Sequence, residues 1–544
     1  MPEILLIQPP IQDFYLTRKR TIPYGLTCLA AALEAAGFSV GLFDALATGK
    51  SRPIRRPNKM AYLDAFFGRP DTSPFALFHQ FRHFGYSHPH IKKIIKESGA
   101  FMVGISSLFT AYSAEALKVA AMAKSVDPDI VVVMGGHHPT ALPEAVMDSE
   151  YVDFVIRGEA ETSLPELAHA VKNGRTPETI PGLVFRCPDR RLKVSEPVWI
   201  NDLDACACPA AHLVKHKYYK RGPQGAAVVM ASRGCPLNCS YCAFGSGGGY
   251  PYRKRSVAAI MREIESQVRD NDVGFVDFED ENLSMDRRWF MELLEAIRQR
   301  FGRSGIELRA MNGLFPPALD DRMIRAMGAA GFKTLNLALG TTDTQQLERF
   351  NRMDVRAAFD AALESARRYG LEAVGYVIAG APDQTAAASL ADLLYLAARR
   401  VLAGVSIFYP APGSLDYDRC RRRGLLPEAF GLMRATALPM DHTTSRLESV
   451  TLLRLGRILN FMKFLKDRGV PFLPEKAASS GELAISADRT TVGRWLLQDF
   501  FRSGIIQGLT PDGQLFDHLV SHRLTRSFIE GIQHLDVKGV AAAS

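Results

Sequence analysis

The sequence lacks long apolar stretches. Its 544 residues contain no apolar run of about 18 or more, the length that a membrane-spanning helix requires. The opening residues, MPEILLIQPP, also lack the basic start and long apolar segment of a secretion signal. We therefore expect a cytoplasmic protein with no membrane span.

The sequence also lacks a strong excess of charge of either sign. The net charge of +8 is too small for so long a chain to indicate nucleic-acid binding, and no nucleic acid is expected as a partner. A solvated surface is the plainer explanation of the local basic patches, and contact with an anionic substrate or partner is the alternative. These patches consist of Lys50, Arg52, Arg55, Arg56 and Lys59, and of Arg419, Arg421, Arg422 and Arg423.

Cysteine is sparse except in one place. The chain has eight cysteines, and three of them, Cys235, Cys239 and Cys242, lie within eight residues. In a protein without a secretion signal, clustered thiols bind metal more often than they form disulfides. This segment is therefore the first candidate for a functional site.

The first 200 residues alternate between strand and helix patterns. Short apolar runs predict strands over residues 4–8, 39–43, 101–106, 130–134 and 154–156, and helices are expected over 26–36 and 111–125. Residues 45–99 form an irregular basic and aromatic insertion in this pattern, and residues 182–194 form a hairpin. The order predicts an α/β fold with an N-terminal doubly wound, Rossmann-like parallel sheet.

A second, more regular alternation follows. Strands are expected over residues 226–231, 274–279, 307–311, 334–338, 372–378 and 405–409, with a helix in each interval between them. Six such repeats predict a partial (β/α)6 barrel over residues 221–424, with its site at the carboxyl ends of the strands. We expect three domains: residues 1–200, residues 221–424, and a mostly helical C-terminal domain over 425–544.

The loop after the first barrel strand has the sequence CPLNCSYC, residues 235–242. Three thiolates on one short loop can hold three irons of a 4Fe–4S cluster and leave the fourth iron open to a small chelating molecule. A structural zinc site is the alternative, and it would need Cys206 or Cys208 as a further ligand. An open corner argues against a pure electron carrier, which normally closes all four irons with protein ligands.

This motif, with an aromatic residue before the third cysteine, resembles the signature of the radical S-adenosylmethionine (SAM) enzymes. The segments GYVIAGAP (375–382) and FYPAPGS (408–414) resemble the fifth and sixth strands of that family's barrel. The resemblance implies a catalytic 4Fe–4S cluster on Cys235, Cys239 and Cys242. It also implies that SAM is a cofactor, with the backbone of Tyr241 and the strand that ends at Gly380 against its adenine. The expected chemistry is reductive cleavage of SAM to a 5′-deoxyadenosyl radical.

Two strand ends depart from the family pattern. The second barrel strand ends in EDEN (279–282) without the usual Gly-Gly-Glu, and the fourth ends in LGT (339–341), where relatives often place Glu-Ser. The residues that hold the amino group and ribose of SAM are therefore open, and each candidate could equally be structural. The candidates near strand ends are Asp280, Arg309, Asn312 and Asn336.

The strand ends of the front sheet carry small residues. They are PP (9–10), SSL (106–108), GGHHPT (135–140) and RGEAE (157–161). Ligands of open α/β sheets bind beyond the carboxyl ends of the strands, and small residues there allow a flat macrocycle to approach. A tight turn explains the Gly-Gly pair equally well.

Together with the connector NDLDACACPA (201–210), these segments resemble the cobalamin-binding domain that precedes many radical SAM barrels. The sequence contains no Asp-x-His-x-x-Gly motif, so the resemblance implies cobalamin bound without a lower histidine ligand. The implied cobalamin contacts are Pro9, Ser106, Ser107, Leu108, Gly135, Gly136, His137, Gly158 and Glu159.

A cobalamin-dependent methyltransferase acting on an unactivated carbon is the first functional hypothesis. A cyclase or ring-rearranging enzyme with the same cofactors, and a non-catalytic corrinoid and iron–sulfur electron carrier, are the alternatives. A methylthiotransferase acting on RNA would need a second cysteine trio in the front domain, where only Cys28 and Cys187 lie.

The expected partners are a small-molecule or natural-product substrate and an electron donor such as a flavodoxin or ferredoxin. A substrate radical is too reactive to diffuse. We therefore expect the edge formed by residues 106–108 and 135–137 to face the barrel mouth near the cysteine loop.

Overall fold

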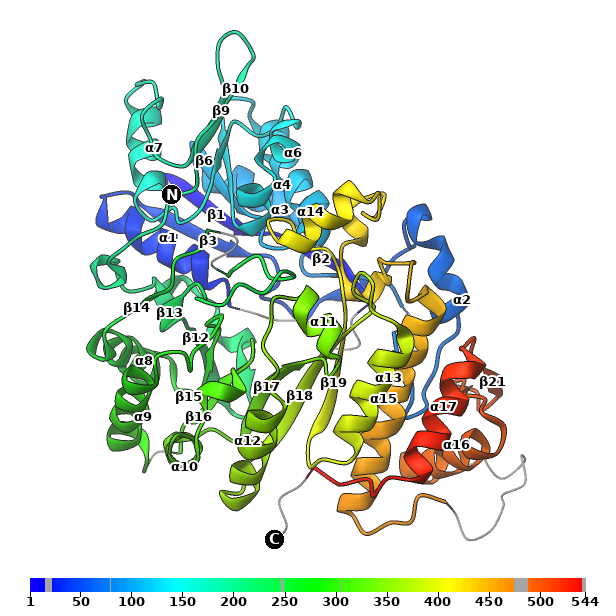
Figure 1. Cartoon of the computed structure of the whole chain (residues 1–544). Helices are drawn as coiled ribbons and strands as arrows, with labels where there is room; N and C mark the ends of the chain where they lie inside the picture. The colour runs from blue at the N-terminus through cyan, green and yellow to red at the C-terminus, as the bar shows by residue number, and fades with distance from the viewer. Residues whose placement is uncertain (15–21, 79, 246–248, 304, 474–487, 541–544) are drawn as a thin grey trace.

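The computed structural model describes residues 1–14, 22–78, 80–245, 249–303, 305–473 and 488–540. A front α/β domain lies above a second α/β unit, and the C-terminal helices flank the second unit on one side (Figure 1). Among the described residues, no helix is both long and apolar enough to cross a bilayer.

The front domain is built on a seven-stranded sheet in the order β10-β9-β8-β7-β6-β1-β3. Five strands are parallel: β1 (Ile4–Gln8), β3 (Val40–Asp44), β6 (Met102–Ser106), β7 (Val131–Gly135) and β8 (Phe154–Ile156). The hairpin of β9 (Leu183–Arg186) and β10 (Leu192–Val194) adds two antiparallel strands at one edge.

Helices cover both faces of this sheet. α1 (Tyr24–Ala35) and α7 (Ser163–Lys172) pack on one face. α3 (His88–Ser98) and α4 (Ser113–Val126) pack on the other. The predicted doubly wound sheet is therefore confirmed, and the carboxyl ends of its parallel strands lie along one edge.

The insertion is more regular than the sequence predicted. Two short strands, β4 (Ser51–Pro53) and β5 (Arg82–Phe84), form a small antiparallel sheet with β2 (Ile11–Asp13), and α2 (Asp64–Phe67) follows β4. The expectation of an irregular segment was wrong for α3. Its Ile91 and Ile95 are buried at helical spacing, and the three lysines between and after them obscured that face.

The second unit contains six parallel strands in two groups of three. β12 (Gln224–Val229), β15 (Val273–Phe278) and β16 (Glu307–Ala310) form one group. β17 (Thr334–Gly340), β18 (Glu372–Ala379) and β19 (Leu402–Ile407) form the other. Single bridges join the groups, Leu308 to Phe332 and Leu314 to Leu337.

The barrel helices lie in the five intervals expected. They are α8 (Val257–Asn271), α9 (Arg287–Phe301), α10 (Asp321–Ala330), α12 (Arg356–Arg368) and α13 (Ala386–Ala397). The partial six-stranded barrel is confirmed, whereas the predicted domain limits stay predictions.

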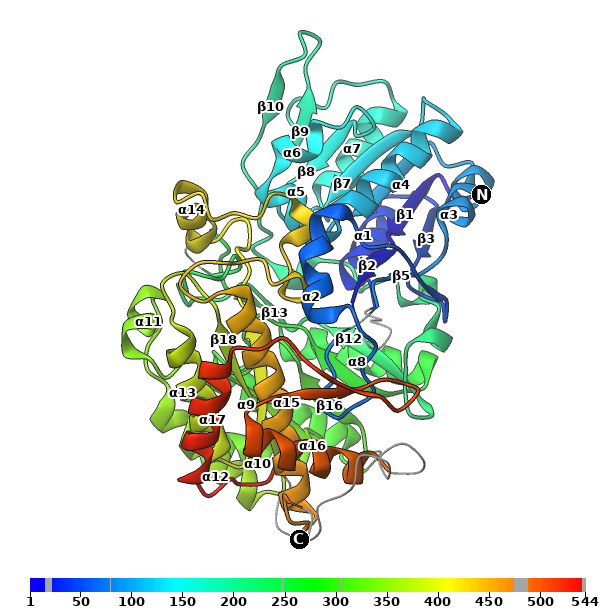
Figure 2. The ribbon, with the colours of Figure 1, turned by 90° about the vertical axis from the view of Figure 1, so that its right-hand side faces the viewer.

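The C-terminal part contributes α15 (Arg446–Asp467), α16 (Arg489–Ser503), α17 (His522–Gln533) and the hairpin of β20 (Gln507–Leu509) and β21 (Leu515–Asp517). Figure 2 shows α2 of the insertion between the front domain and these helices. The ring of Phe75 packs edge-on against Phe461 of α15 at 5.7 Å. Arg454 donates to the carbonyl oxygens of Phe66 and Phe75. The insertion is therefore part of the core that covers the barrel.

Candidate active site between the front sheet and the barrel

The cysteine loop begins at the carboxyl end of β12 and is held by the end of β15. The carboxylate of Asp280 accepts hydrogen bonds from the backbone N–H of Ala231 (3.1 Å) and of Ser232 (2.5 Å), and from the Ser232 hydroxyl. Glu281 accepts from the N–H of Gly234 at 3.0 Å. Both oxygens of Asp280 are engaged by the loop, which favours a role in positioning the loop over the predicted SAM contact.

The three cysteines lie in a protected place. Cys235 and Cys239 are buried and Cys242 is half-buried. Burial, with a smaller contribution from the neighbouring thiols, raises the pKa of the Cys242 thiol to about 11. A cationic iron centre would offset both effects by stabilising the thiolates.

The spacing of these thiols fits a cluster better than one metal ion. The three thiols are not among the groups whose ligand atoms all lie within 4.8 Å of one another; within the described residues, that is true only of His83, His88 and Glu115 in the front domain. Ligands of a single zinc ion lie about 2.3 Å from it, and would therefore form such a compact group. The donor set fits three irons of a 4Fe–4S cluster.

Arg352 is the functional candidate that sequence reasoning missed. One of its guanidinium nitrogens, Nη1, lies 3.9 Å from the Cys239 sulfur and 2.9 Å from the Tyr241 hydroxyl. Its Nε is buried and has no hydrogen-bond partner within the described part of the chain. A Cβ at Gly340 would come within 3.0 Å of that nitrogen. The unusual glycine at the end of β17 thus makes room for a half-buried cation beside the cysteine loop.

The other predicted SAM contacts divide into two groups. Arg309 pairs with Asp277, and the buried Asn336 donates to the carbonyl oxygen of Ala310 at 3.1 Å, so both have protein partners. Asn312 is exposed beyond the end of β16, where its amide donates to the Glu279 carbonyl oxygen at 2.8 Å, and Gly380 follows β18 with φ +75°. These two positions remain the better placed of the predicted set.

The edge of the front sheet faces the cysteine loop. His137, after β7, stacks on the ring of Phe244 with centroids 4.6 Å apart, and its Nδ1 lies 3.3 Å from the Tyr250 hydroxyl. Phe244 is two residues beyond Cys242. Burial lowers the pKa of His137 to about 4, so the ring is neutral at ordinary pH. The predicted apposition of the two strand-end edges is confirmed.

The same edge fits a large, partly apolar ligand. The hydroxyl of Ser107 is buried with no hydrogen-bond partner among the described residues. The next two side chains, Leu108 and Phe109, are 48% and 46% exposed. Gly136 has φ +110°, and a Cβ there would lie 2.9 Å from the Ser107 carbonyl oxygen. A hydroxyl without a partner at Ser107, half-exposed apolar side chains and close-packed small residues are suitable for a corrin ring.

The last strand end is closed by protein instead. Gly158 forms a bridge with Val198, and a Cβ there would lie 2.2 Å from the Val198 carbonyl oxygen. Glu159 receives two hydrogen bonds from Arg253, 2.8 and 3.0 Å long, and their side chains are 12% and 9% exposed. These contacts favour a role for Gly158 and Glu159 at the junction between the domains over the predicted cobalamin contact.

Glu159→Ala should destabilise the protein by about 3–5 kcal/mol, because it leaves the guanidinium of Arg253 buried without its partner. Cobalamin affinity should stay unchanged. Urea unfolding and a corrin-binding titration check the two parts, with the exposed Glu178→Ala as the control. A variant of normal stability that no longer binds corrin would restore Glu159 to the cobalamin site.

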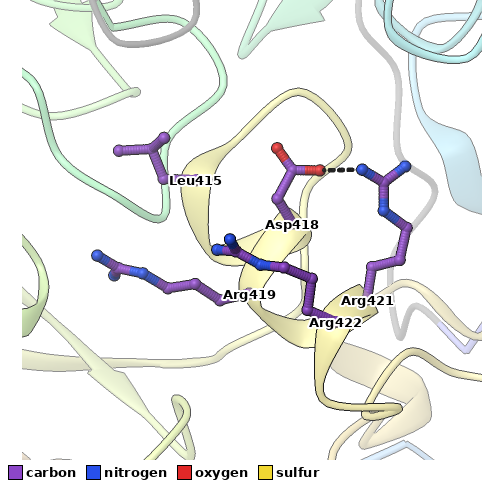
Figure 3. Close-up of a pocket in the computed structure, with 5 residues that line it drawn as sticks. All are labelled: Leu415, Asp418, Arg419, Arg421 and Arg422. Atoms are coloured by element: carbon purple, nitrogen blue, oxygen red, sulfur yellow. Dashed lines mark hydrogen bonds and ion pairs between the residues drawn. The ribbon is translucent and has the colours of Figure 1, made fainter.

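A basic surface lies behind the cysteine loop. α14 (Leu415–Arg422) begins where the N–H of Asp416 donates to the Ser240 carbonyl oxygen at 2.9 Å, and the Ser240 hydroxyl donates to the Asp416 carboxylate. A surface pocket of about 400 Å³ on this helix is lined by Leu415, Asp418, Arg419, Arg421 and Arg422 (Figure 3). Arg421 pairs with Asp418 and Arg419 pairs with Asp416, whereas Arg422 extends from the helix.

Comparisons with known proteins match both halves of this arrangement. Residues 79–168 match the B12 binding domain, and residues 229–394 match the radical SAM superfamily. The chain therefore combines a B12-binding domain with a radical SAM domain. These matches assign cobalamin and SAM to the two domains, and the cysteine trio is a donor set that fits a 4Fe–4S cluster.

Three curated relatives illustrate the range of this group. An uncharacterized methyltransferase of Pyrococcus horikoshii is 28% identical, over 54% of this chain and 63% of the relative. Cytidylyl-2-hydroxyethylphosphonate methyltransferase of Streptomyces wedmorensis is 25% identical, over 80% and 84%. Anaerobic magnesium-protoporphyrin IX monomethyl ester cyclase of Rubrivivax gelatinosus is 30% identical, over 52% of each. The chain therefore spans only about half to two thirds of two of these relatives.

Two solved structures share the fold. The radical SAM methyltransferase TsrM of Kitasatospora setae superimposes with a TM-score of 0.58 at 17% identity, over 78% of this chain and 75% of that one. The cobalamin-dependent radical enzyme OxsB gives 0.62 at 12% identity, over 93% and 71%.

Proposed function

We propose that this enzyme transfers a methyl group to an unactivated carbon of a small molecule. The observation that carries the proposal is the contact between His137 and Phe244, which brings the front-sheet edge against the cysteine loop. When bound, the cofactors supply a 5′-deoxyadenosyl radical and a transferable methyl group. A substrate between the two edges would meet both without leaving the protein.

The chain's own residues bind, orient and exclude water. The apolar side chains at the facing edges, including Leu108, Phe109 and the 51%-exposed Met311, would shield a radical from solvent. Arg352 would hold the carboxylate of SAM, because its half-buried guanidinium lies beside the cysteine loop that would carry the cluster.

Arg352→Met should weaken SAM binding by about 10–100-fold, since a buried charge-assisted contact contributes about 1.5–3 kcal/mol. Arg352→Lys, which keeps the positive charge, should lose less of the SAM affinity. Equilibrium binding of SAM to the cluster-loaded protein measures the effect, with Arg349→Met, on an exposed neighbour, as the control. Unchanged affinity in the methionine variant would leave Arg352 with a role in the loop alone.

The methyltransferase hypothesis is tested by product mass. Incubation of the reduced, cofactor-loaded enzyme with its substrate should yield a product heavier by one methyl group, with both 5′-deoxyadenosine and S-adenosylhomocysteine. A product without added methyl and no S-adenosylhomocysteine would favour cyclisation, the reaction named for the Rubrivivax relative. Absence of SAM cleavage under reducing conditions would favour the non-catalytic alternative.

An acidic low-potential carrier such as a flavodoxin or ferredoxin is the proposed electron donor. The arginine-bearing surface of α14 supports this, because its first turn is hydrogen-bonded to Ser240, between two cluster cysteines. Arg419→Glu with Arg422→Glu should slow reduction by a protein donor, while SAM cleavage driven by dithionite should continue. Equal loss with both reductants would contradict this docking site.

A further inference from the structure

Three side chains of the front domain form a compact group away from the cysteine loop. They are His83 on β5, His88 at the start of α3 and Glu115 in the first turn of α4. A possible ligand atom from each lies within 4.8 Å of the other two, and no other such group occurs in the described ranges. The Nε2 of His88 is 2.9 Å from a carboxylate oxygen of Glu115. The imidazole rings are 5.5 Å apart at 72°.

We propose that this group binds a divalent transition-metal ion, with zinc the best match. Two imidazoles and one carboxylate are a ligand set that zinc uses with water in the fourth position. Imidazole suits zinc, copper and nickel, whereas magnesium and calcium prefer sites made of oxygen atoms. The three ligands come from three separate elements, so the folded domain brings them together.

The surroundings orient two of the ligands. The Nε2 of His83 lies 3.0 Å from the Tyr86 carbonyl oxygen, to which it donates, so Nδ1 carries the lone pair when the ring is neutral. A backbone carbonyl on the second nitrogen is the usual support of a metal-binding histidine. His83 and Glu115 are only 3% and 4% exposed, which fixes them in place. The side chain of His88 is 30% exposed and gives an ion access from solvent.

Hydrogen bonds and ion pairs within the protein account for only part of this arrangement of side chains. Glu115 pairs with His88 and with Lys118, whose Nζ lies 2.6 Å from the second carboxylate oxygen. The Lys118 side chain is 52% exposed and free to swing into solvent when an ion neutralises the carboxylate. The ion pair does not include the buried His83, whose Nε2 bonds to the Tyr86 carbonyl oxygen. A metal would use all three side chains and tie the insertion to two helices of the front sheet.

The test uses the full-length, cofactor-loaded enzyme after removal of loosely bound metal with a chelator. Zinc is titrated in competition with a coloured chelator, while total iron and cobalt are measured in each sample. The wild type should bind one additional zinc per chain. Glu115→Gln and His83→Gln should each weaken binding by about 100-fold or more. His90→Gln is the matched control, because His90 lies on α3, the helix that carries His88, but stacks on Tyr86 outside the group.

Two results would overturn the proposal. One is wild-type zinc binding no tighter than that of Glu115→Gln; the other is an equal loss in His90→Gln. If a variant is destabilised, its unfolding temperature measured with and without zinc still separates loss of the metal site from loss of stability. Zinc should raise the unfolding temperature of the wild type alone, whereas an ion pair alone would give no zinc dependence in any protein. Iron content, cobalt content and SAM cleavage report on the proposed function separately.

Discussion

A protein without iron and without detectable SAM cleavage is the expected result of replacing Cys235, Cys239 and Cys242 together with alanine. The three thiols are the protein ligands that the loop offers to the cluster, and the loop itself is fixed from outside by Asp280 and Glu281. The backbone should therefore persist while the cluster is lost. Iron analysis, the visible spectrum after anaerobic purification and 5′-deoxyadenosine formation measure the effect.

The matched control replaces Cys206 and Cys208 in the connector between the domains. Burial is the main cause that raises the pKa of both thiols, and neither thiol lies on the cysteine loop. Iron content of about four per chain and normal SAM cleavage are expected for this pair. Loss of the cluster in the control would move a ligand to the connector and revive the zinc alternative.

The second large effect is expected at the corrin edge. Leu108→Trp should weaken cobalamin binding by at least about 100-fold, because the side chain lies in the open space that a macrocycle needs and a larger ring would fill it. Reductive SAM cleavage should continue, since its site is on the barrel. Corrin retention after gel filtration and the yield of 5′-deoxyadenosine check the two halves.

Leu108→Ala is the matched variant and should keep corrin binding. This position is a better probe than Gly136, where any side chain would meet the Ser107 carbonyl oxygen and disturb the turn itself. Methylated product from a corrin-free Leu108→Trp enzyme would refute the proposed methyl transfer. Loss of both activities together would show that the substitution disturbs the barrel as well.

Local patterns were sufficient to predict the two sheets. Apolar runs such as residues 4–8 and 154–156 are bounded by proline or glycine and become buried parallel strands, because their period and punctuation agree. α3 was missed because its buried isoleucines are surrounded by lysines, although Pro89 at its start and Gly99 after its end are ordinary helix signals.

The site was predictable only where the chemistry is local. The cysteine trio lies on one loop, so its spacing carries the function. The roles of Asp280 and Glu159 depend on partners 48 and 94 residues away, which a single sequence does not specify. Arg352 lies 113 residues from Cys239, and its only signal was the unexpected Gly340.

The packing of the insertion onto α15 also affects how the chain is synthesised. Arg454 and the backbone of Phe75, which it contacts, are separated by 379 residues. At about 5–20 residues per second, the ribosome needs roughly 20–75 s to add that stretch. During this time Phe67 and Phe75, both fully buried in the final fold, have no core to enter. The nascent enzyme should therefore depend on chaperones, and slow or incomplete translation should lead to aggregation through its first hundred residues.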